Sequence, residues 1–158
     1  MKVLTLTFAL VAVSLVSFAQ SDTVKVYTYV EEMTEKSYIM TTVDLIATEN
    51  GTKGIKIMAN ISNAKELTSF IISQYDMGSA CNENNTLIIK FIDGSKIKIL
   101  SYNQFSCKNS YFRVPFTAVE QLKTLEIEKI YYQNGDSYES GTFPVNNPRY
   151  FIQLYKGL

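Results

Sequence analysis

The sequence predicts an all-β domain, a two-layer β-sandwich with one short α-helix, and three observations carry that prediction. The chain is rich in Tyr, Phe, Ile, Val and Thr, which favour strands. Turn signals such as ENGTKG, DGS and QNGD recur at short spacing, as in sandwiches and barrels. Segments between these turns alternate apolar and polar residues, the period of a half-buried strand. A closed β-barrel is the alternative arrangement of the same strands.

Residues 1–19 have the layout of a secretory signal peptide. Lys2 precedes an apolar run over residues 3–16, and Ser17 and Ala19 place small residues at −3 and −1 of a cut after Ala19. The run is shorter than the roughly 20 apolar residues that span a bilayer. We therefore expect an exported protein, periplasmic or extracellular, with one β-rich domain over residues 20–158 and no membrane span in the mature chain.

Eight or nine strands are expected in that domain. Residues 23–31 form the first, with Val26, Thr28 and Val30 sharing one face. Residues 38–48 form the second and residues 54–62 the third. Residues 63–75 fit either a helix, begun by Asn63, or a buried strand around Phe70. We favour the strand.

The stretch TLIIKFIDGSKIKIL predicts a hairpin around an Asp-Gly turn. A register that places Phe91 opposite Ile97, and Ile89 opposite Ile99, keeps apolar residues on one face. Later in the chain, Thr117 and Glu120 match a capping box for the one helix. A second hairpin is expected around Asn134-Gly135, a type I′ signal, and residues 149–157 as the last strand.

The two cysteines, Cys81 and Cys107, are predicted to form a disulfide. When the hairpin register is extended outward, it places them opposite each other on the core-facing side. Export favours the bond, because disulfides persist in oxidising compartments. Two separate buried thiols are the alternative. A redox-active pair is disfavoured, because the chain has no C-x-x-C motif.

Several activities are excluded by residues that the chain lacks. It contains no histidine, which removes Ser-His-Asp and Cys-His catalysis and every zinc site with a histidine ligand. Two cysteines cannot complete a four-thiolate site, so neither a metal nor another cofactor is expected. The chain carries 15 basic and 15 acidic residues with no basic patch in sequence, which gives no indication of nucleic-acid binding.

Two groups of side chains remain as candidate functional residues. Paired carboxylates, such as Glu126 with Glu128, occur in glycoside hydrolases. A tyrosine-rich contact surface is the other candidate, because tyrosine offers a large amphipathic area at low entropic cost. The tyrosines of this candidate binding surface are Tyr131, Tyr132, Tyr138, Tyr150 and Tyr155.

Two patterns resemble those of small exported proteins of Bacteroidetes-type bacteria. One is the signal-peptide ending SFAQ, and the other is LIIKFIDGSKIKI followed by FSCKNSYF and VEQLKTLEIEKI, within residues 81–130. The resemblance implies export and a β-rich domain, and it assigns no catalytic residue. We expect a non-catalytic binding or interaction domain, with a protein or glycan partner at the cell envelope. A small-ligand carrier barrel and a carboxylate-dependent hydrolase are the alternatives.

Overall fold

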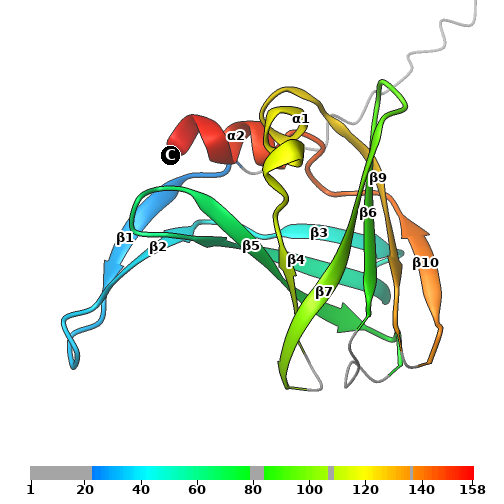
Figure 1. Ribbon diagram of the computed structural model, residues 1–158, viewed down its shortest axis with the longest axis horizontal. Helices are drawn as coiled ribbons and strands as arrows, with labels where there is room; N and C mark the ends of the chain where they lie inside the picture. The colour runs from blue at the N-terminus through cyan, green and yellow to red at the C-terminus, as the bar shows by residue number, and fades with distance from the viewer. Residues whose placement is uncertain (1–22, 79–83, 107–108, 136) are drawn as a thin grey trace, which may run out of the picture.

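The fold is seen in a computed structural model, which describes residues 23–78, 84–106, 109–135 and 137–158. Ten strands form one antiparallel sheet in the order β1-β2-β4-β5-β8-β7-β6-β9-β10, and β3 also pairs with β4 (Figure 1). The predicted all-β class is therefore confirmed. The sheet formed by the described strands is not closed, so its arrangement is open and sandwich-like rather than a barrel. The strands are β1 (Val26–Val30), β2 (Ser37–Thr41), β3 (Leu45–Glu49), β4 (Lys53–Ile61), β5 (Leu67–Tyr75), β6 (Thr86–Phe91), β7 (Lys96–Ser106), β8 (Asn109–Arg113), β9 (Ile127–Gln133) and β10 (Ser140–Phe143).

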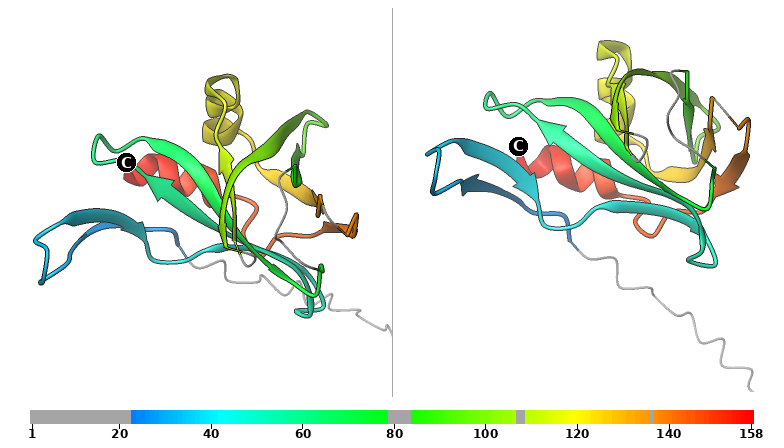
Figure 2. Two further views of the ribbon diagram at one scale, coloured as in Figure 1. Left: turned by 60° about the horizontal axis from the view of Figure 1, so that its bottom comes forward. Right: turned by 90° about the horizontal axis from the view of Figure 1, so that it is seen from below.

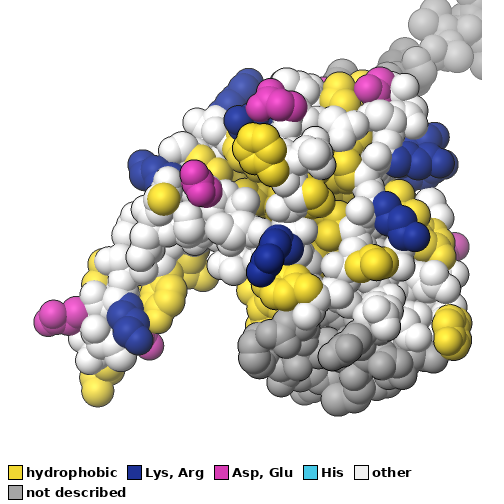
Figure 3. Space-filling model, in the orientation of Figure 1, with side chains coloured by type: hydrophobic (Ala, Val, Ile, Leu, Met, Phe, Trp, Pro, Cys, Tyr) yellow, Lys and Arg dark blue, Asp and Glu magenta, His cyan; other side chains and the backbone are white. Residues whose placement is uncertain are grey.

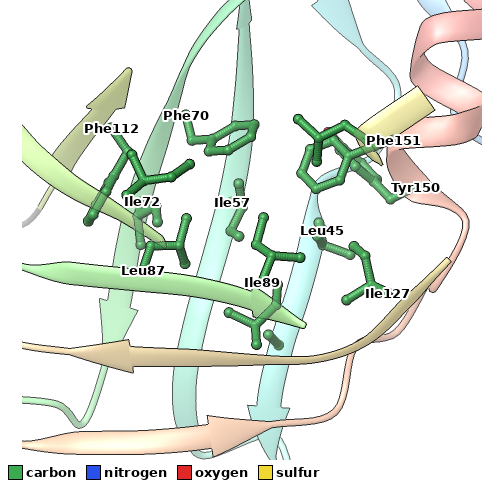
Figure 4. Packing of buried hydrophobic residues seen from close by; sticks show 14 of the residues in the cluster. Leu45, Ile57, Phe70, Ile72, Leu87, Ile89, Phe112, Ile127, Tyr150 and Phe151 are labelled. Atoms are coloured by element: carbon green, nitrogen blue, oxygen red, sulfur yellow. The ribbon is translucent and has the colours of Figure 1, made fainter. Parts of the chain in front are cut away.

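The long strand β7 is the corner at which the sheet bends back on itself. Its first part pairs with β6 and its second part with β8, with register shifts at Ser101 and Asn103. Such irregularities bend a strand and let it pass from one layer to another. The two halves of the sheet therefore enclose one core (Figure 2). In Figure 4, Phe70 and Phe112 from one half lie across from Leu87 and Ile89 of the other.

Two short helices lie outside the sheet. The predicted helix is confirmed as α1 (Val119–Thr124), preceded by a 3-10 turn over Phe116–Ala118. The capping box does not form: no side chain of a described residue caps the N-terminus, and Glu120 instead pairs with Lys123 at 3.3 Å. Packing of Leu122 into the core stabilises this short helix, because so few residues hold a helix weakly on their own.

The expected last strand is wrong: those residues form helix α2 (Tyr150–Gly157). Its buried side chains, Tyr150, Phe151 and Leu154, share one helical face. The Phe151 ring lies 5.1 Å from that of Phe70, so the helix covers the open side of the core. A short apolar run fits a strand or a helix equally by periodicity.

The expected strand over residues 38–48 is divided into β2 and β3. Both parts lie along the same edge of β4, where Ile39 pairs with Ile61 and Leu45 pairs with Ile57. The break between them lets the β1–β2 hairpin leave the body of the sheet. Residues 67–75 form strand β5, which confirms the favoured prediction for that segment.

The β6–β7 hairpin is confirmed, but its predicted register is wrong by two residues. Leu87 pairs with Ile99 and Ile89 with Ile97. A three-residue loop over 92–94 closes the hairpin, with Gly94 at φ +87. Asp93 accepts hydrogen bonds from the Ser95 amide and hydroxyl, which hold the pKa of its carboxyl below the usual value.

This register removes the alignment that placed Cys81 opposite Cys107. The observed ladder between β6 and β7 ends at Thr86 and Leu100, and beyond it β7 pairs with β8 instead. Both cysteines lie outside the described residues, so the disulfide stays a prediction that rests on export alone.

The β9–β10 hairpin is also confirmed, with a longer loop than the expected type I′ turn. The Asn134 amide donates to the Glu139 carbonyl at 2.8 Å, which leaves four residues in the loop. Asn134 is buried, and its side-chain amide donates to the Met77 carbonyl at 3.0 Å. This contact holds Asn134 inside the fold instead of at the tip of a turn.

Candidate binding site

The outer face of the β6–β7–β9–β10 half carries a pocket of about 260 Å³. It is lined by Ile88, Lys90, Lys96, Lys129, Tyr131 and Thr142. Strand alternation explains its composition, because Leu87 and Ile89 point into the core while their neighbours point outward. Figure 3 shows Lys and Arg side chains beside hydrophobic ones over this part of the molecule.

Strand register arranges these side chains in two rows across the sheet. In one row, Lys98 lies opposite Ile88, Ile88 opposite Tyr131, and Tyr131 opposite Thr142. In the other row, Lys96 and Lys129 flank Lys90. We call the side chains of these two rows the lysine face. One row thus supplies an aromatic and apolar surface, and the other supplies positive charge.

Glu128 partly neutralises this face. A bulge where β9 passes β6 places it beside Lys90, with the two charged groups 2.6 Å apart, and 3.3 Å from Lys129. The hydrogen bond from Lys90, and then that from Lys129, hold the pKa of the Glu128 carboxyl below its usual value. Four lysines and one glutamate leave the face with a net charge of +3.

The five tyrosines of the predicted binding surface do not share one surface. Tyr132 and Tyr150 are fully buried, because they occupy core-facing positions of β9 and α2. Burial raises the pKa of both phenols, that of Tyr150 to about 12. Tyr138 is exposed in the β9–β10 loop, and Tyr155 is half-buried with the Lys123 ammonium 5.5 Å from its ring centre. Only Tyr131 lines the pocket.

A buried polar network anchors the hairpin that carries Tyr131. The Asn85 side chain donates to the Ser110 hydroxyl at 2.6 Å and accepts from the Gly135 amide at 2.7 Å. On the same hairpin, the Tyr132 hydroxyl donates to the Gln74 side chain at 3.0 Å. Buried polar groups paired in this way fix the position of the strands that hold them.

The two carboxylates that suggested hydrolysis form ion pairs with different basic side chains. Glu126 lies 3.3 Å from Arg149, while Glu128 contacts Lys90 and Lys129. Among the described residues, no three His, Cys, Asp or Glu side chains come close enough to hold a metal ion.

The lysine face was missed because its lysines are scattered along the sequence. They stand at alternate positions of TLIIKFIDGSKIKIL and in a strand some 30 residues later, so no run of basic residues reveals them. The signal that could have revealed a shared face is that the lysines of the hairpin occupy outward-facing positions of its two strands.

Comparison with protein-family models, curated proteins and solved structures found no match for this chain. The resemblance to exported Bacteroidetes-type proteins therefore stays an expectation. Within the described residues, no helix is both long and apolar enough to cross a membrane.

Proposed function

We propose that this chain is an exported, non-catalytic binding protein whose lysine face binds an anionic glycan, one that carries carboxylate or sulfate groups. The supporting observation is the pocket in which the lysine row lies beside the row of Ile88, Tyr131 and Thr142. An aromatic ring offers a flat surface for a sugar ring, and adjacent ammonium groups pair with its acidic substituents.

The size and position of the pocket fit a polymer better than an enclosed small ligand. Its volume of about 260 Å³ is smaller than the roughly 300–1,000 Å³ of small-molecule sites, and it opens on the outer face of a sheet. One or two sugar units fit there while the chain of the glycan continues across the strands. The interior of the fold is occupied by packed side chains such as Phe70 and Phe112.

Titration calorimetry of residues 20–158 with oligogalacturonate, a carboxylated sugar polymer, tests the proposal. We expect binding that weakens as salt is added, since salt screens exposed charges. Dextran sulfate tests sulfate as the acidic group, and uncharged dextran should not bind. Tyr131→Ala and Lys96→Glu should each weaken binding at least tenfold, while Lys65→Glu, with the same charge change in a distant turn, should not.

Three results would count against the proposal. Equal binding of dextran and of the acidic polymers would remove the role of the lysines. Binding to an acidic protein but to neither acidic polymer would replace the glycan with a protein partner. Release of new reducing ends from oligogalacturonate would make the protein an enzyme.

Export is tested separately by the mass of the protein recovered from the envelope or medium of its native host. Cleavage after Ala19 predicts a chain that begins at Gln20. Recovery of the uncut chain from the cytoplasm would contradict this part of the proposal.

A further inference from the structure

Strand β1 forms an open edge of the sheet. It pairs with β2, and no other strand described in the structure lies beside it. The β1–β2 hairpin projects from the body of the molecule (Figures 1 and 2), joined to β4 through the pair of Ile39 and Ile61. Five large apolar side chains on its two strands are 43–52% exposed, namely Tyr27, Tyr29, Val30, Tyr38 and Met40. An apolar edge strand of this kind is a template for pairing with another strand.

The sequence of this edge is self-complementary. Residues 25–31 read KVYTYVE, a mirror repeat about Thr28 with opposite charges at its ends. If two copies pair antiparallel about Thr28, valine lies opposite valine and tyrosine opposite tyrosine. At both ends, Lys25 of one copy lies opposite Glu31 of the other. Such cross-strand pairs are the units that stabilise a sheet.

The directions in which the backbone groups of β1 point are also consistent with pairing centred on Thr28. The Lys25 carbonyl accepts from the Thr42 amide, and the Glu31 amide donates to the Lys36 carbonyl, both at 2.9 Å. The odd-numbered residues therefore direct their backbone groups toward β2. By alternation, Val26, Thr28 and Val30 direct theirs toward the open edge. Pairing about Thr28 places these outward groups opposite one another, with two hydrogen bonds for each of three pairs.

We propose that a second copy of this chain docks on β1, and that the two sheets join across a twofold axis at Thr28. A twofold interface requires one surface to be complementary to itself, and residues 25–31 meet that requirement in side-chain type, charge and backbone phase. Tyr27, Tyr29, Tyr38 and Met40 of both copies then form one continuous apolar stripe, because cross-strand partners share a face. The end of α2 lies beside Val26, which is half-buried, while Tyr27 and Tyr29 on the other face of β1 are exposed.

Analytical ultracentrifugation of residues 20–158, from micromolar to submillimolar concentration, tests this proposal. We expect a reversible monomer–dimer equilibrium. Thr28→Pro removes an outward amide without removing a bond to β2, so it should weaken the dimer at least tenfold. Thr28→Val, which keeps the amide, should leave the dimer intact, and circular dichroism should show all variants folded.

Charge exchange tests the register. Lys25→Glu and Glu31→Lys should each weaken self-association, because like charges then face each other at both ends. An equimolar mixture of the two variants should dimerise again, and so should the chain that carries both changes. Glu31→Lys also removes the hydrogen bond from Thr34 to Glu31 within one copy. The mixture controls for this effect, because the same variant should dimerise again when its charge partner is present.

The proposal is overturned if the wild-type chain stays monomeric throughout this range. It is also overturned by a dimer that persists in Thr28→Pro, or by single charge variants that associate as strongly as their mixture. Capture of a different protein by β1, with the wild-type chain itself monomeric, assigns the edge to that other partner and rejects the second copy.

Discussion

Asn146 makes two hydrogen bonds to Ile46 across the gap between two distant parts of the sheet. The Ile46 amide donates to the Asn146 side-chain oxygen at 2.9 Å, and the Asn146 amide donates to the Ile46 carbonyl at 2.9 Å. Beside them, Ala47 and Val145 form an isolated antiparallel bridge. This contact ties the segment after β10 to β3, although the strands do not continue into a closed ladder.

Asn146→Ala removes one of these two bonds and should lower the free energy of unfolding by about 1 kcal/mol. The larger effect is local: the Ile46 amide should exchange its hydrogen faster in the native state. Urea denaturation and amide exchange measure the two effects. Asn63→Ala, in an exposed turn, is the control, and unchanged exchange at Ile46 would show that the side chain does not hold the junction.

Gly54→Ala should destabilise the fold strongly. A Cβ at this position, where φ is +149, would lie 2.2 Å from the Ala47 carbonyl oxygen, and that oxygen belongs to backbone that cannot easily move. We expect a loss of about 3 kcal/mol or more, as for overpacking combined with backbone strain.

Gly51→Ala provides the matched control for this change. Gly51 has φ +74 but no atom within 4 Å of the added carbon, so only the backbone strain of about 1 kcal/mol remains. Thermal denaturation compares the two variants. Equal losses would mean that the approach of β3 to Gly54 is not what requires glycine there.

Tyr150→Phe should preserve stability at neutral pH or raise it by about 1 kcal/mol. The Tyr150 hydroxyl is buried near Thr41 and the Ala59 backbone, yet it makes no hydrogen bond of normal geometry with a described residue. An unpaired buried hydroxyl is costly, so its removal is tolerated. A loss of more than 2 kcal/mol at neutral pH, measured by urea denaturation, would mean that the hydroxyl is paired.

The pH dependence of the same variant tests the cause of the pKa shift. Burial, and to a smaller extent the charge of Asp44, raise the pKa of Tyr150 from 10.0 to about 12. The folded chain thus holds the phenolic proton more tightly than the unfolded chain. The contribution of the Tyr150 phenol to the free energy of unfolding is fully present below pH 10 and is lost as the pH rises through 12. The wild type should lose about 2 kcal/mol more than Tyr150→Phe over that interval. If the wild type and Tyr150→Phe lost the same stability over this interval, the raised pKa of Tyr150 would be contradicted.

The predicted disulfide is tested by thiol titration of mature protein that has been denatured without reduction. Cys81 and Cys107 are the only cysteines, so we expect no reactive sulfhydryl before reduction and two afterwards. Reduction should cost about 3 kcal/mol of stability by the loop-entropy argument. Two reactive thiols per unreduced chain would show that the pair is not bonded.

The side of the sheet on which a residue lies was predictable from its neighbours alone. Leu87, Ile89 and Phe91 are buried as their alternation required, because a strand has a strict period of two. The register of the same hairpin was not predictable in this way. A slip of two residues leaves every face unchanged, and the loop closed by Phe91 and Ser95 decided between the two registers.

The candidate site depended still more on long-range contacts. Tyrosines were counted as surface residues by type, but Tyr132 and Tyr150 fill the core while Tyr131 lines the pocket. Lys129 joins Lys90 and Lys96 only because β9 pairs with β6, and pairing between distant strands leaves no local mark in the sequence.

The sequence by itself determined the β-rich class, the inward and outward faces of the strands and the mirror-symmetric stretch from Lys25 to Glu31, because these follow from residue types a few positions apart. Tertiary structure decided that residues 150–157 form a helix and that, among the described strands, the sheet stays open with KVYTYVE along one of its edges. Each of those outcomes depends on which apolar surfaces remain to be covered once the strands have paired, and that is a property of the whole chain.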